Sequence, residues 1–227
     1  MTSRDVLVVF ARYPAAGEVK TRLARDIGDR AAADVYRAFL EDLAARFAPA
    51  PFAVRWAVAP PDRGLSGLLG VAPSSCFPQS GADLGDRMRG ALRHLLVDEA
   101  HERCAIVGSD MPQLTLETIA EAFAALDRGA DLVLGPAEDG GYYLIAMRAA
   151  HEVFAGIEWG SSRVLAQTRA RAAGLGLRVH ELALGFDVDR AADLARLRAL
   201  LRAEDAATAM PATAKAIARI RGDAPDR

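Results

Sequence analysis

Short apolar runs recur along the chain at spacings that suit the strands of a buried sheet. Most are rich in β-branched or aromatic residues and carry few charges, as expected of strands that are covered on both faces. The predicted strands cover residues 6–10, 52–59, 104–107, 131–134, 142–147 and 177–182, with a short edge strand beginning at residue 77. We expect the strand at 142–147 to return antiparallel to its neighbours.

Segments whose apolar residues have the spacing of amphipathic helices lie between these runs. After Asp29, which we expect to cap a long helix, apolar residues repeat every four positions and give one face that we interpret as core. They are Val35, Phe39, Leu43 and Phe47. Further helices are predicted at about 18–28, 84–100, 115–127, 163–173, 193–201 and 214–220. We expect Gly160-Ser161-Ser162 to cap the helix that ends near Ala173.

The alternation of strands and helices predicts an α/β fold with a mostly parallel sheet. We see no internal repeat and no linker that would divide the chain. The sequence therefore predicts one domain over residues 1–227, with a core at about 5–201 and a helical tail at 203–227.

Composition narrows the class of protein. The 227 residues are 52% hydrophobic, which is enough for a large core, and the net charge of −2 gives no basic field for a nucleic-acid partner. Cys76 and Cys104 lie far apart and form no metal-binding pair, so free thiols are expected. We find no signal peptide and no apolar segment long enough for a membrane, and we expect a cytoplasmic location.

Asp110 follows the apolar run at 104–107 and the short break Gly108-Ser109. Pro112 disfavours a helix starting at Met111, so the carboxylate lies just beyond the carboxyl end of a predicted central strand. In open α/β sheets, ligands bind at that edge. Taken alone, Asp110 is better explained as a turn residue before the next helix, so its role depends on its partners.

Lysine occurs only at Lys20 and Lys215 in a chain that otherwise uses arginine. Lys20 lies in the Pro- and Gly-containing loop after the first strand, together with Arg12 and Arg22. Three cations beside free backbone N–H groups suit a polyphosphate, although a solvated basic loop is the simpler alternative. The loop has neither the ending of a P-loop nor the Gly-x-Gly-x-x-Gly pattern of dinucleotide-binding proteins.

Two other loops have the composition of pocket walls. Gln79 and Asp83 precede a predicted helix and would contact the base or ribose of a nucleotide. An equally good interpretation is that Gln79 is a turn residue and Asp83 caps the helix. Residues 138–142 read Glu-Asp-Gly-Gly-Tyr, and two glycines let the backbone approach a ligand closely. A simple hairpin turn is the alternative there.

Acidic residues gather at the predicted strand ends and in the neighbouring loops. They are Asp110, Glu138, Asp139, Asp187 and Asp189. Carboxylates suit Mg²⁺ or Mn²⁺, which commonly bind through one or two of them together with substrate phosphates. A metal and cations around a diphosphate would stabilise the charge that leaves with it. This chemistry fits a nucleotidyltransferase that releases pyrophosphate and equally a glycosyltransferase that releases a nucleoside diphosphate.

Two other catalytic classes fit less well. In aspartyl-phosphate enzymes the nucleophilic Asp usually ends the first strand, and here that strand ends in Phe10-Ala11-Arg12. A serine nucleophile would need a Gly-x-Ser-x-Gly turn, which the sequence lacks. The four scattered histidines are interpreted as surface or packing residues.

Five motifs occur together in one order. They are the run Phe10 to Leu23, Gln79-Ser-Gly-Ala-Asp-Leu-Gly-Asp-Arg-Met88, Gly108-Ser-Asp-Met-Pro112, Gly135-Pro-Ala-Glu-Asp-Gly-Gly-Tyr-Tyr-Leu144 and Asp187-Val-Asp-x-x-x-Asp-Leu194. With them the sequence resembles the DUF2064 family, also described as a glycosyltransferase A family linked to arsenosugar biosynthesis. It is similar in plan to the nucleotide-diphospho-sugar transferase superfamily. The resemblance covers about residues 5–201.

The resemblance implies a GT-A, Rossmann-like three-layer α/β/α sandwich with a partly mixed sheet. It implies that Asp110 and Asp189 are the ligands of Mg²⁺ or Mn²⁺, and that Lys20 and Arg22 belong to a phosphate-binding loop. Arg12 stands where many members have Lys, which keeps the charge. Gly160-Ser161-Ser162 departs from the Ser-Thr pair that usually follows the Trp.

The motifs and the family resemblance together give a set of expected site residues. The nucleotide is expected to contact Phe10, Ala11, Arg12, Gly17, Lys20, Arg22, Gln79, Asp83 and Ser109. The sugar or acceptor pocket is expected to include Glu138, Asp139, Gly140, Gly141, Tyr142 and Trp159. Lys20 and Arg22 are the expected catalytic cations, with Asp139 as the general base for the acceptor.

Three hypotheses follow. The first is a metal-dependent transferase that uses a nucleotide-sugar donor and a small-molecule acceptor. The second is a nucleotidyltransferase that transfers NMP from an NTP to a phosphorylated small acceptor. The third is a non-catalytic nucleotide-binding protein of the same fold. A homodimer is compatible with all three, and the sequence does not decide the oligomeric state.

Overall fold

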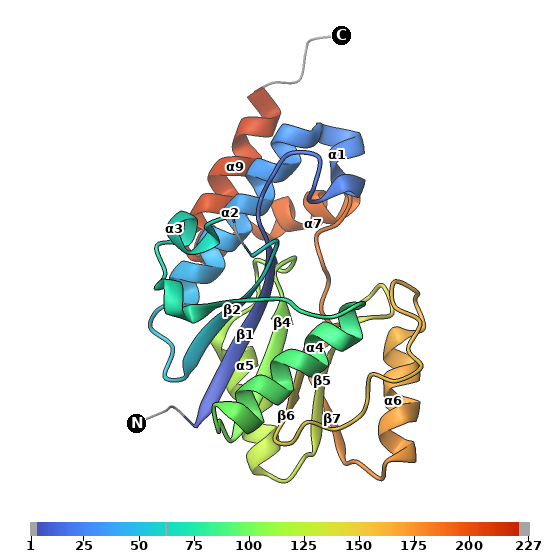
Figure 1. The fold of residues 1–227 in the computed structure, drawn as a ribbon. Helices are drawn as coiled ribbons and strands as arrows, with labels where there is room; N and C mark the ends of the chain where they lie inside the picture. The colour runs from blue at the N-terminus through green and yellow to red at the C-terminus, as the bar shows by residue number, and fades with distance from the viewer. Residues whose placement is uncertain (1–3, 62, 223–227) are drawn as a thin grey trace.

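The computed structural model describes residues 4–61 and 63–222, and within them seven strands form one sheet between two helical layers (Figure 1). Its spatial order is β3-β2-β1-β4-β6-β5-β7. The strands are β1 Asp5–Arg12, β2 Ala53–Ala59, β3 Cys76–Pro78, β4 Arg103–Gly108, β5 Leu132–Pro136, β6 Tyr142–Met147 and β7 Val179–Glu181. The predicted α/β sandwich with a mostly parallel, partly mixed sheet is confirmed.

All the strand pairings are parallel except those of β6, which runs antiparallel to both β4 and β5. The reversal arises because only the loop at 137–141 joins β5 to β6, and such a short connection makes an antiparallel pair. The antiparallel return that the sequence predicts at 142–147 is confirmed. The edge strand expected near residue 77 is β3.

Helices cover both faces of the sheet. They are α1 Thr21–Ile27, α2 Asp29–Phe47, α3 Leu65–Leu69, α4 Leu84–Arg93, α5 Leu116–Asp127, α6 Val164–Gly174, α7 Ala191–Leu200, α8 Glu204–Ala209 and α9 Pro211–Gly222. The apolar residues of α4 and α6 pack on one face, and those of α1, α2, α5, α7 and α9 pack on the other. Figure 1 shows α4 in front of the sheet, with α6 to the right of the strands.

The central strands alternate between these two cores. In β1, Leu7 and Val9 face the α2 side, whereas Val6 and Val8 face the α4 side, and all four are fully buried. This explains why the strand reads as a continuous apolar run rather than as an alternating one.

Several boundaries differ from the prediction. The first helix begins at Thr21 rather than near Glu18, because Lys20 adopts a left-handed conformation with φ 48°. The helix expected to reach residue 100 ends at Arg93 and continues as a π-helical turn over 94–98. The predicted cap Gly160-Ser161-Ser162 is wrong, because α6 begins at Val164 after an uncapped Arg163. The last strand is limited to Val179–Glu181.

The C-terminal helices are fixed to α2 by polar contacts. The buried Asp42 carboxylate accepts the backbone N–H groups of Ala212 (3.0 Å) and Thr213 (2.8 Å) at the start of α9. Arg46 donates to the carbonyls of Leu114 (2.8 Å) and Ala209 (2.6 Å). The predicted tail is therefore docked helix as far as residue 222, and its last five residues lie outside the described ranges.

The sheet brings the carboxyl ends of β1, β2, β4 and β5 to one edge. After β1 the chain moves outward to β2 and β3, and it then returns to pair β4 with the other side of β1. The strand order therefore reverses between β1 and β4, which is where open α/β sheets bind their ligands. No helix in the described part of the chain is long and apolar enough to cross a membrane.

Candidate active site

A cavity of about 430 Å³ opens at the reversal point between β1 and β4. Its walls come from the loop after β1, the start of α1, the Tyr36 side of α2, the loop after β3 with the start of α4, and the residues that follow β4. Its polar lining residues include Arg12, Glu18, Lys20, Arg22, Gln79, Arg87, Ser109, Asp110 and Asp189. Residues from distant parts of the sequence thus meet in one hollow.

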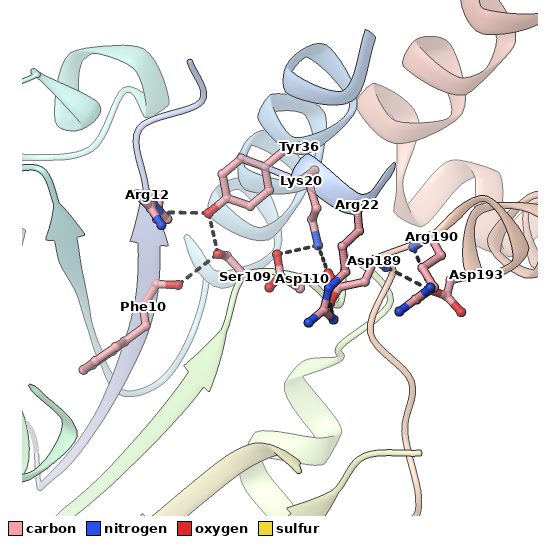
Figure 2. Close-up of polar contacts among 10 residues, drawn as sticks. All are labelled: Phe10, Arg12, Lys20, Arg22, Tyr36, Ser109, Asp110, Asp189, Arg190 and Asp193. Carbon is pink, nitrogen blue, oxygen red and sulfur yellow. Dashed lines mark hydrogen bonds and ion pairs between the residues drawn. The ribbon is translucent and has the colours of Figure 1, made fainter. Parts of the chain in front are cut away.

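Lys20 lies on the inner wall of this cavity, with its side chain only 3% exposed. Its Nζ is 2.6 Å from Oδ1 of Asp110 and 2.9 Å from Oδ1 of Asp189 (Figure 2). Burial by itself would lower the pKa of Lys20, but the two carboxylates outweigh that effect and raise it above its ordinary value. Lys20 is therefore a charged ammonium shared by two acids.

The two acids are brought together by backbone bonds as well as by Lys20. The N–H of Val188 donates to the carbonyl of Asp110 at 2.9 Å, which joins the segment before α7 to the end of β4. The carboxylate of Asp193 accepts the N–H groups of Asp189 (3.0 Å) and Arg190 (2.8 Å) and fixes the start of α7. The late Asp187-Val188-Asp189 motif is thus held beside Asp110 by its own main chain.

A chain of hydroxyl groups links α2 to the ends of β1 and β4. The N–H of Arg12 donates to the Tyr36 hydroxyl at 3.0 Å, and the Ser109 hydroxyl donates to the carbonyl of Phe10 at 2.9 Å. Tyr36 and Ser109 are 2.7 Å apart, and since the Ser109 proton is already used, Tyr36 is the donor between them. Burial and the Asp110 charge raise the pKa of Tyr36 to about 12, so it stays a neutral donor.

The remaining cations of the cavity are only weakly paired. The Arg22 guanidinium lies 3.6 Å from Asp189 and its side chain is largely exposed. Arg12 and Arg87 have no carboxylate partner among the described residues, whereas Glu18 is already paired with Arg63 at 2.9 Å. The cavity therefore presents positive charge to an anionic ligand, next to a carboxylate pair.

Asp187 lies two residues before Asp189 and is half-buried. Its pKa is raised to about 7, chiefly by burial and in addition by the charges of Asp110, Asp139 and Asp189, while Lys20 opposes the rise. Each of these three carboxylates therefore lies within electrostatic reach of Asp187. Asp139 is not among the residues that line the cavity.

The loop after β3 joins this cavity to a second, mostly apolar one of about 270 Å³. Phe10, Gln79 and Arg87 line both. The Gln79 amide donates to the carbonyls of Ala11 (3.1 Å) and Ala57 (2.9 Å), so its nitrogen holds strand ends together. The other residue predicted from this loop is Asp83, which caps α4.

The carboxylate of Asp83 accepts the N–H of Asp86 at 2.8 Å. It lines neither cavity, and the capping interpretation accounts for its position. Gly17 is in a left-handed turn with φ 78° before Lys20. The predicted nucleotide contacts of Asp83 and Gly17 stay predictions.

The residues predicted for the acceptor pocket lie outside the main cavity. Both carboxylate oxygens of Glu138 bind Arg196, at 2.8 and 2.7 Å. Asp139 accepts the N–H of Gly141 at 2.8 Å and closes the turn before β6. Trp159 packs on Gly85 in the first turn of α4, where a Cβ would lie 2.6 Å from its ring.

Gly140 and Tyr142 complete that set. Gly140 has φ +88° and lies so close to Ser162 that a Cβ would be 2.1 Å from the Ser162 carbonyl oxygen. Tyr142 faces the core between the sheet and α6, and burial raises the pKa of its hydroxyl. Their contact with an acceptor stays a prediction.

The donor set of the cavity fits a divalent cation in part. Asp110 and Asp189 offer carboxylate oxygens from side chains that are 45% and 38% exposed, which is the hard oxygen chemistry that Mg²⁺ and Mn²⁺ prefer. Within residues 4–61 and 63–222, no group of three or more His, Cys, Asp and Glu side chains forms a fuller site. Two carboxylates suit a metal that takes its other ligands from water and substrate phosphates.

Tyr36 and Arg87 are the site residues that reasoning from the sequence missed. Tyr36 is a buried residue of α2 next to the predicted core position Val35, and a pattern of apolar positions does not show where a hydroxyl points. Arg87 follows the cap at Asp83 by four residues, on the first turn of α4. The signal that could have found it is its place in the motif Gln79 to Met88, beside the predicted loop contacts.

Comparison with known proteins supports the resemblance seen in the sequence. Residues 44–161 match the family described as "Uncharacterized protein conserved in bacteria (DUF2064)". Among proteins of curated function, none matches this chain. A candidate nucleotide-diphospho-sugar transferase from Desulfovibrio desulfuricans superimposes with a TM-score of 0.87 at 30% sequence identity, over 99% of this chain and 100% of that one.

More distant solved structures share the fold. A cytidylyltransferase from Leptospira borgpetersenii has a TM-score of 0.58 at 11% identity, over 99% of this chain and 100% of that one. A CMP:2-keto-3-deoxy-manno-octonic acid synthetase in complex with CTP has a TM-score of 0.53 at 15% identity, over 89% and 100%. At these identities the likeness establishes the architecture alone.

Proposed function

The chain belongs to the DUF2064 family and has the nucleotide-diphospho-sugar transferase fold, and from that premise we propose that it is a metal-dependent transferase with a nucleotide-sugar donor. The relative from Desulfovibrio desulfuricans, similar over its full length, is named for that class of reaction. The acceptor is a small molecule.

One observation carries the proposal. A cavity at the reversal point of the sheet places Lys20, Arg12 and Arg22 around a pair of carboxylates. Cations alone would suit many anions, and acids alone would suit a structural ion. Their combination is suited to a phosphate group that is bound together with a metal, as in nucleotide-dependent transferases.

The diphosphate of the donor is held between the two kinds of charge. Asp110 and Asp189 would hold the metal, which when bound neutralises charge on the phosphate oxygens and so makes the nucleoside diphosphate a better leaving group. Arg12, at the end of β1, and Arg22, in the first turn of α1, bind the same oxygens. Guanidinium groups suit this role because they donate paired hydrogen bonds and stay charged.

Asp139 is the proposed general base for the acceptor hydroxyl. Its charge acts on Asp187, which lies two residues before the proposed metal ligand Asp189. One of the Asp139 oxygens accepts the N–H of Gly141 at 2.8 Å, which orients the carboxylate without removing its capacity to accept a proton. The base would take the hydroxyl proton as the sugar C1 is attacked.

Calorimetry with ADP-, CDP-, GDP-, TDP- and UDP-linked sugars, each with and without Mn²⁺, tests the donor class. We expect at least one donor to bind in a metal-dependent manner, with binding weakened about tenfold or more in Asp110→Ala. Asp34→Ala, at an exposed position on α2 outside this cavity, is the matched control. Absence of binding to every donor in wild type contradicts the proposal.

Product analysis separates glycosyl from nucleotidyl transfer. The proposed reaction releases a nucleoside diphosphate from the sugar donor. Release of pyrophosphate from an NTP, lost in Asp110→Ala, identifies a nucleotidyltransferase instead, which uses the same phosphate and metal contacts. Binding of nucleotides without any turnover identifies a non-catalytic binding protein of this fold.

A further inference from the structure

The ammonium group of Lys20 lies where the two carboxylates of the site converge. It contacts Asp110 at 2.6 Å and Asp189 at 2.9 Å, and its side chain is almost fully enclosed. Nζ also lies 5.8 Å from the ring centres of Tyr36 and Phe39, so its stem is packed against α2. Both inner carboxylate oxygens are therefore already neutralised in the protein without ligands.

The acid pair does not need Lys20 in order to form. The Val188 N–H to Asp110 carbonyl bond (2.9 Å) and the Asp193 cap on Asp189 (3.0 Å) involve backbone groups that Lys20 does not touch. If Lys20 were absent, the two carboxylates would remain side by side, with only the exposed Arg22 guanidinium near them in the described part of the chain, 3.6 Å from Asp189. A pair of that kind attracts a divalent cation more strongly than one that shares an ammonium group.

We propose that Lys20 is an internal counter-ion that holds the cation position of the free protein, so that a divalent metal binds tightly only together with the nucleotide. This inference rests on the proposed function, because it requires a ligand whose phosphate oxygens can accept Lys20. It adds that the binding of the metal depends on the binding of the nucleotide. Metal and nucleotide favour each other's binding, and metal alone binds weakly.

The geometry gives the reason for the coupling. A metal on Asp110 and Asp189 repels the ammonium group, which has no other described acid in contact with it. Phosphate oxygens supply new acceptors for Lys20 and further ligands for the metal at the same time. The cost of breaking the ion pairs is therefore offset only when both ligands are present, which is a positive coupling between the two sites.

Measurement of Mn²⁺ binding without nucleotide tests the inference on Lys20→Met. Electron paramagnetic resonance of free Mn²⁺ gives the affinity directly and needs no activity. We expect Lys20→Met to bind Mn²⁺ roughly tenfold or more tightly than wild type, because a unit of positive charge is removed from beside the metal. Lys215→Met is the matched control, since Lys215 is the other lysine of the chain and is exposed on α9.

A second arm measures the coupling itself. In wild type, Mn²⁺ affinity should rise in the presence of the nucleoside diphosphate that binds best among ADP, CDP, GDP, TDP and UDP. In Lys20→Met and in Lys20→Gln, whose folding is checked by thermal denaturation, this rise should be several-fold smaller. Equal Mn²⁺ affinity of wild type and both folded variants without nucleotide would overturn the inference.

The two proposals fail in distinguishable ways. If no nucleotide or nucleotide sugar binds wild type, the proposed function fails, while tighter Mn²⁺ binding in the Lys20 variants still supports the counter-ion role. If nucleotides bind in a metal-dependent manner but both folded Lys20 variants have the Mn²⁺ affinity of wild type, with and without nucleotide, the proposed function stands and the inference is overturned.

Discussion

The hydroxyl groups of Tyr36 and Ser109 lie 2.7 Å apart and connect the middle of α2 to the residue before Asp110. Tyr36 also accepts the N–H of Arg12, so a single side chain ties both strands that border the cavity (Figure 2). The loops that carry the acid and the cations are thus held in register by a residue of the helical layer behind them.

Tyr36→Phe should weaken this connection while the ring stays packed. The Arg12 N–H and the Ser109 hydroxyl each lose a partner, so we expect a loss of about 1–2 kcal/mol in the free energy of unfolding and several-fold weaker nucleotide binding. Urea denaturation and calorimetry measure the two effects. Tyr13→Phe is the control, because its hydroxyl has no hydrogen bond in the described structure. Equal behaviour of the two variants would contradict the role of Tyr36.

Asp42→Ala should loosen the C-terminal helix without affecting the site. The buried carboxylate accepts two N–H groups at the start of α9, and charged bonds of this kind contribute about 1–3 kcal/mol. We expect a decrease of roughly 2–3 kcal/mol in the free energy of unfolding with unchanged nucleotide affinity. Hydrogen exchange should become faster in α9 before any change in β1 or β4. Asp34→Ala on the same helix should have no such effect.

The strands were predictable because their apolar runs are local features. The runs at 6–10 and 104–107 recovered β1 and β4, and the position of Asp110 at the strand end followed from Gly108 and Pro112. The start of α1 was not predictable. Lys20 is drawn into a left-handed conformation whose side chain contacts two acids distant in sequence.

Side-chain partnerships account for the other differences. Arg196 pairs with Glu138, which the sequence suggested for the acceptor pocket, and no local pattern relates these two residues. Arg87 reads as an ordinary polar residue of an amphipathic helix, and only the turn before α4 directs it to the cavity. Long-range contacts of this kind are set by tertiary packing rather than by periodicity.

Asp187 should make the protein less stable as the pH rises. Its pKa is raised from 3.8 to about 7 on folding. Between those values the folded protein holds a proton that the unfolded chain has lost, so the free energy of unfolding falls with increasing pH until about pH 7. Asp187→Asn removes this dependence. We expect its stability relative to wild type to grow by roughly 2–3 kcal/mol between pH 5 and pH 8.

Urea denaturation at pH 5 and at pH 8, with EDTA present, measures the free energy of unfolding of wild type and Asp187→Asn. Asp34→Asn, at an exposed position, is the control and should follow wild type at both pH values. A difference between Asp187→Asn and wild type that stays constant with pH would show that the carboxyl ionises normally.

Gly140→Ala should be strongly destabilising. The residue has φ +88°, which alanine adopts only with strain, and the new Cβ would lie 2.1 Å from a backbone oxygen of Ser162. We expect a loss of about 2–4 kcal/mol, because neither backbone can move without disturbing the turn before β6. Gly67→Ala in α3 is the control, since its Cβ meets nothing within 4 Å. Similar melting temperatures of the two variants would rule out the close approach.

Arg87→Ala should weaken nucleotide binding with little change in stability. The guanidinium lines both cavities and makes only a long hydrogen bond of 3.3 Å to the Gly81 carbonyl, so folding gains little from it. If it binds a phosphate or stacks on a base, its removal should reduce affinity by about tenfold. The loss should be smaller at high salt, where charge contacts are screened.

Arg89→Ala is the matched variant for this prediction. Arg89 lies two residues away on the same helix, pairs with Asp86 at 2.5 Å and lines neither cavity. Calorimetry with the best nucleotide sugar at two salt concentrations should therefore show an effect for Arg87→Ala and none for Arg89→Ala. An equal decrease in both variants would indicate a general charge effect of α4, and no decrease in either would remove Arg87 from the site.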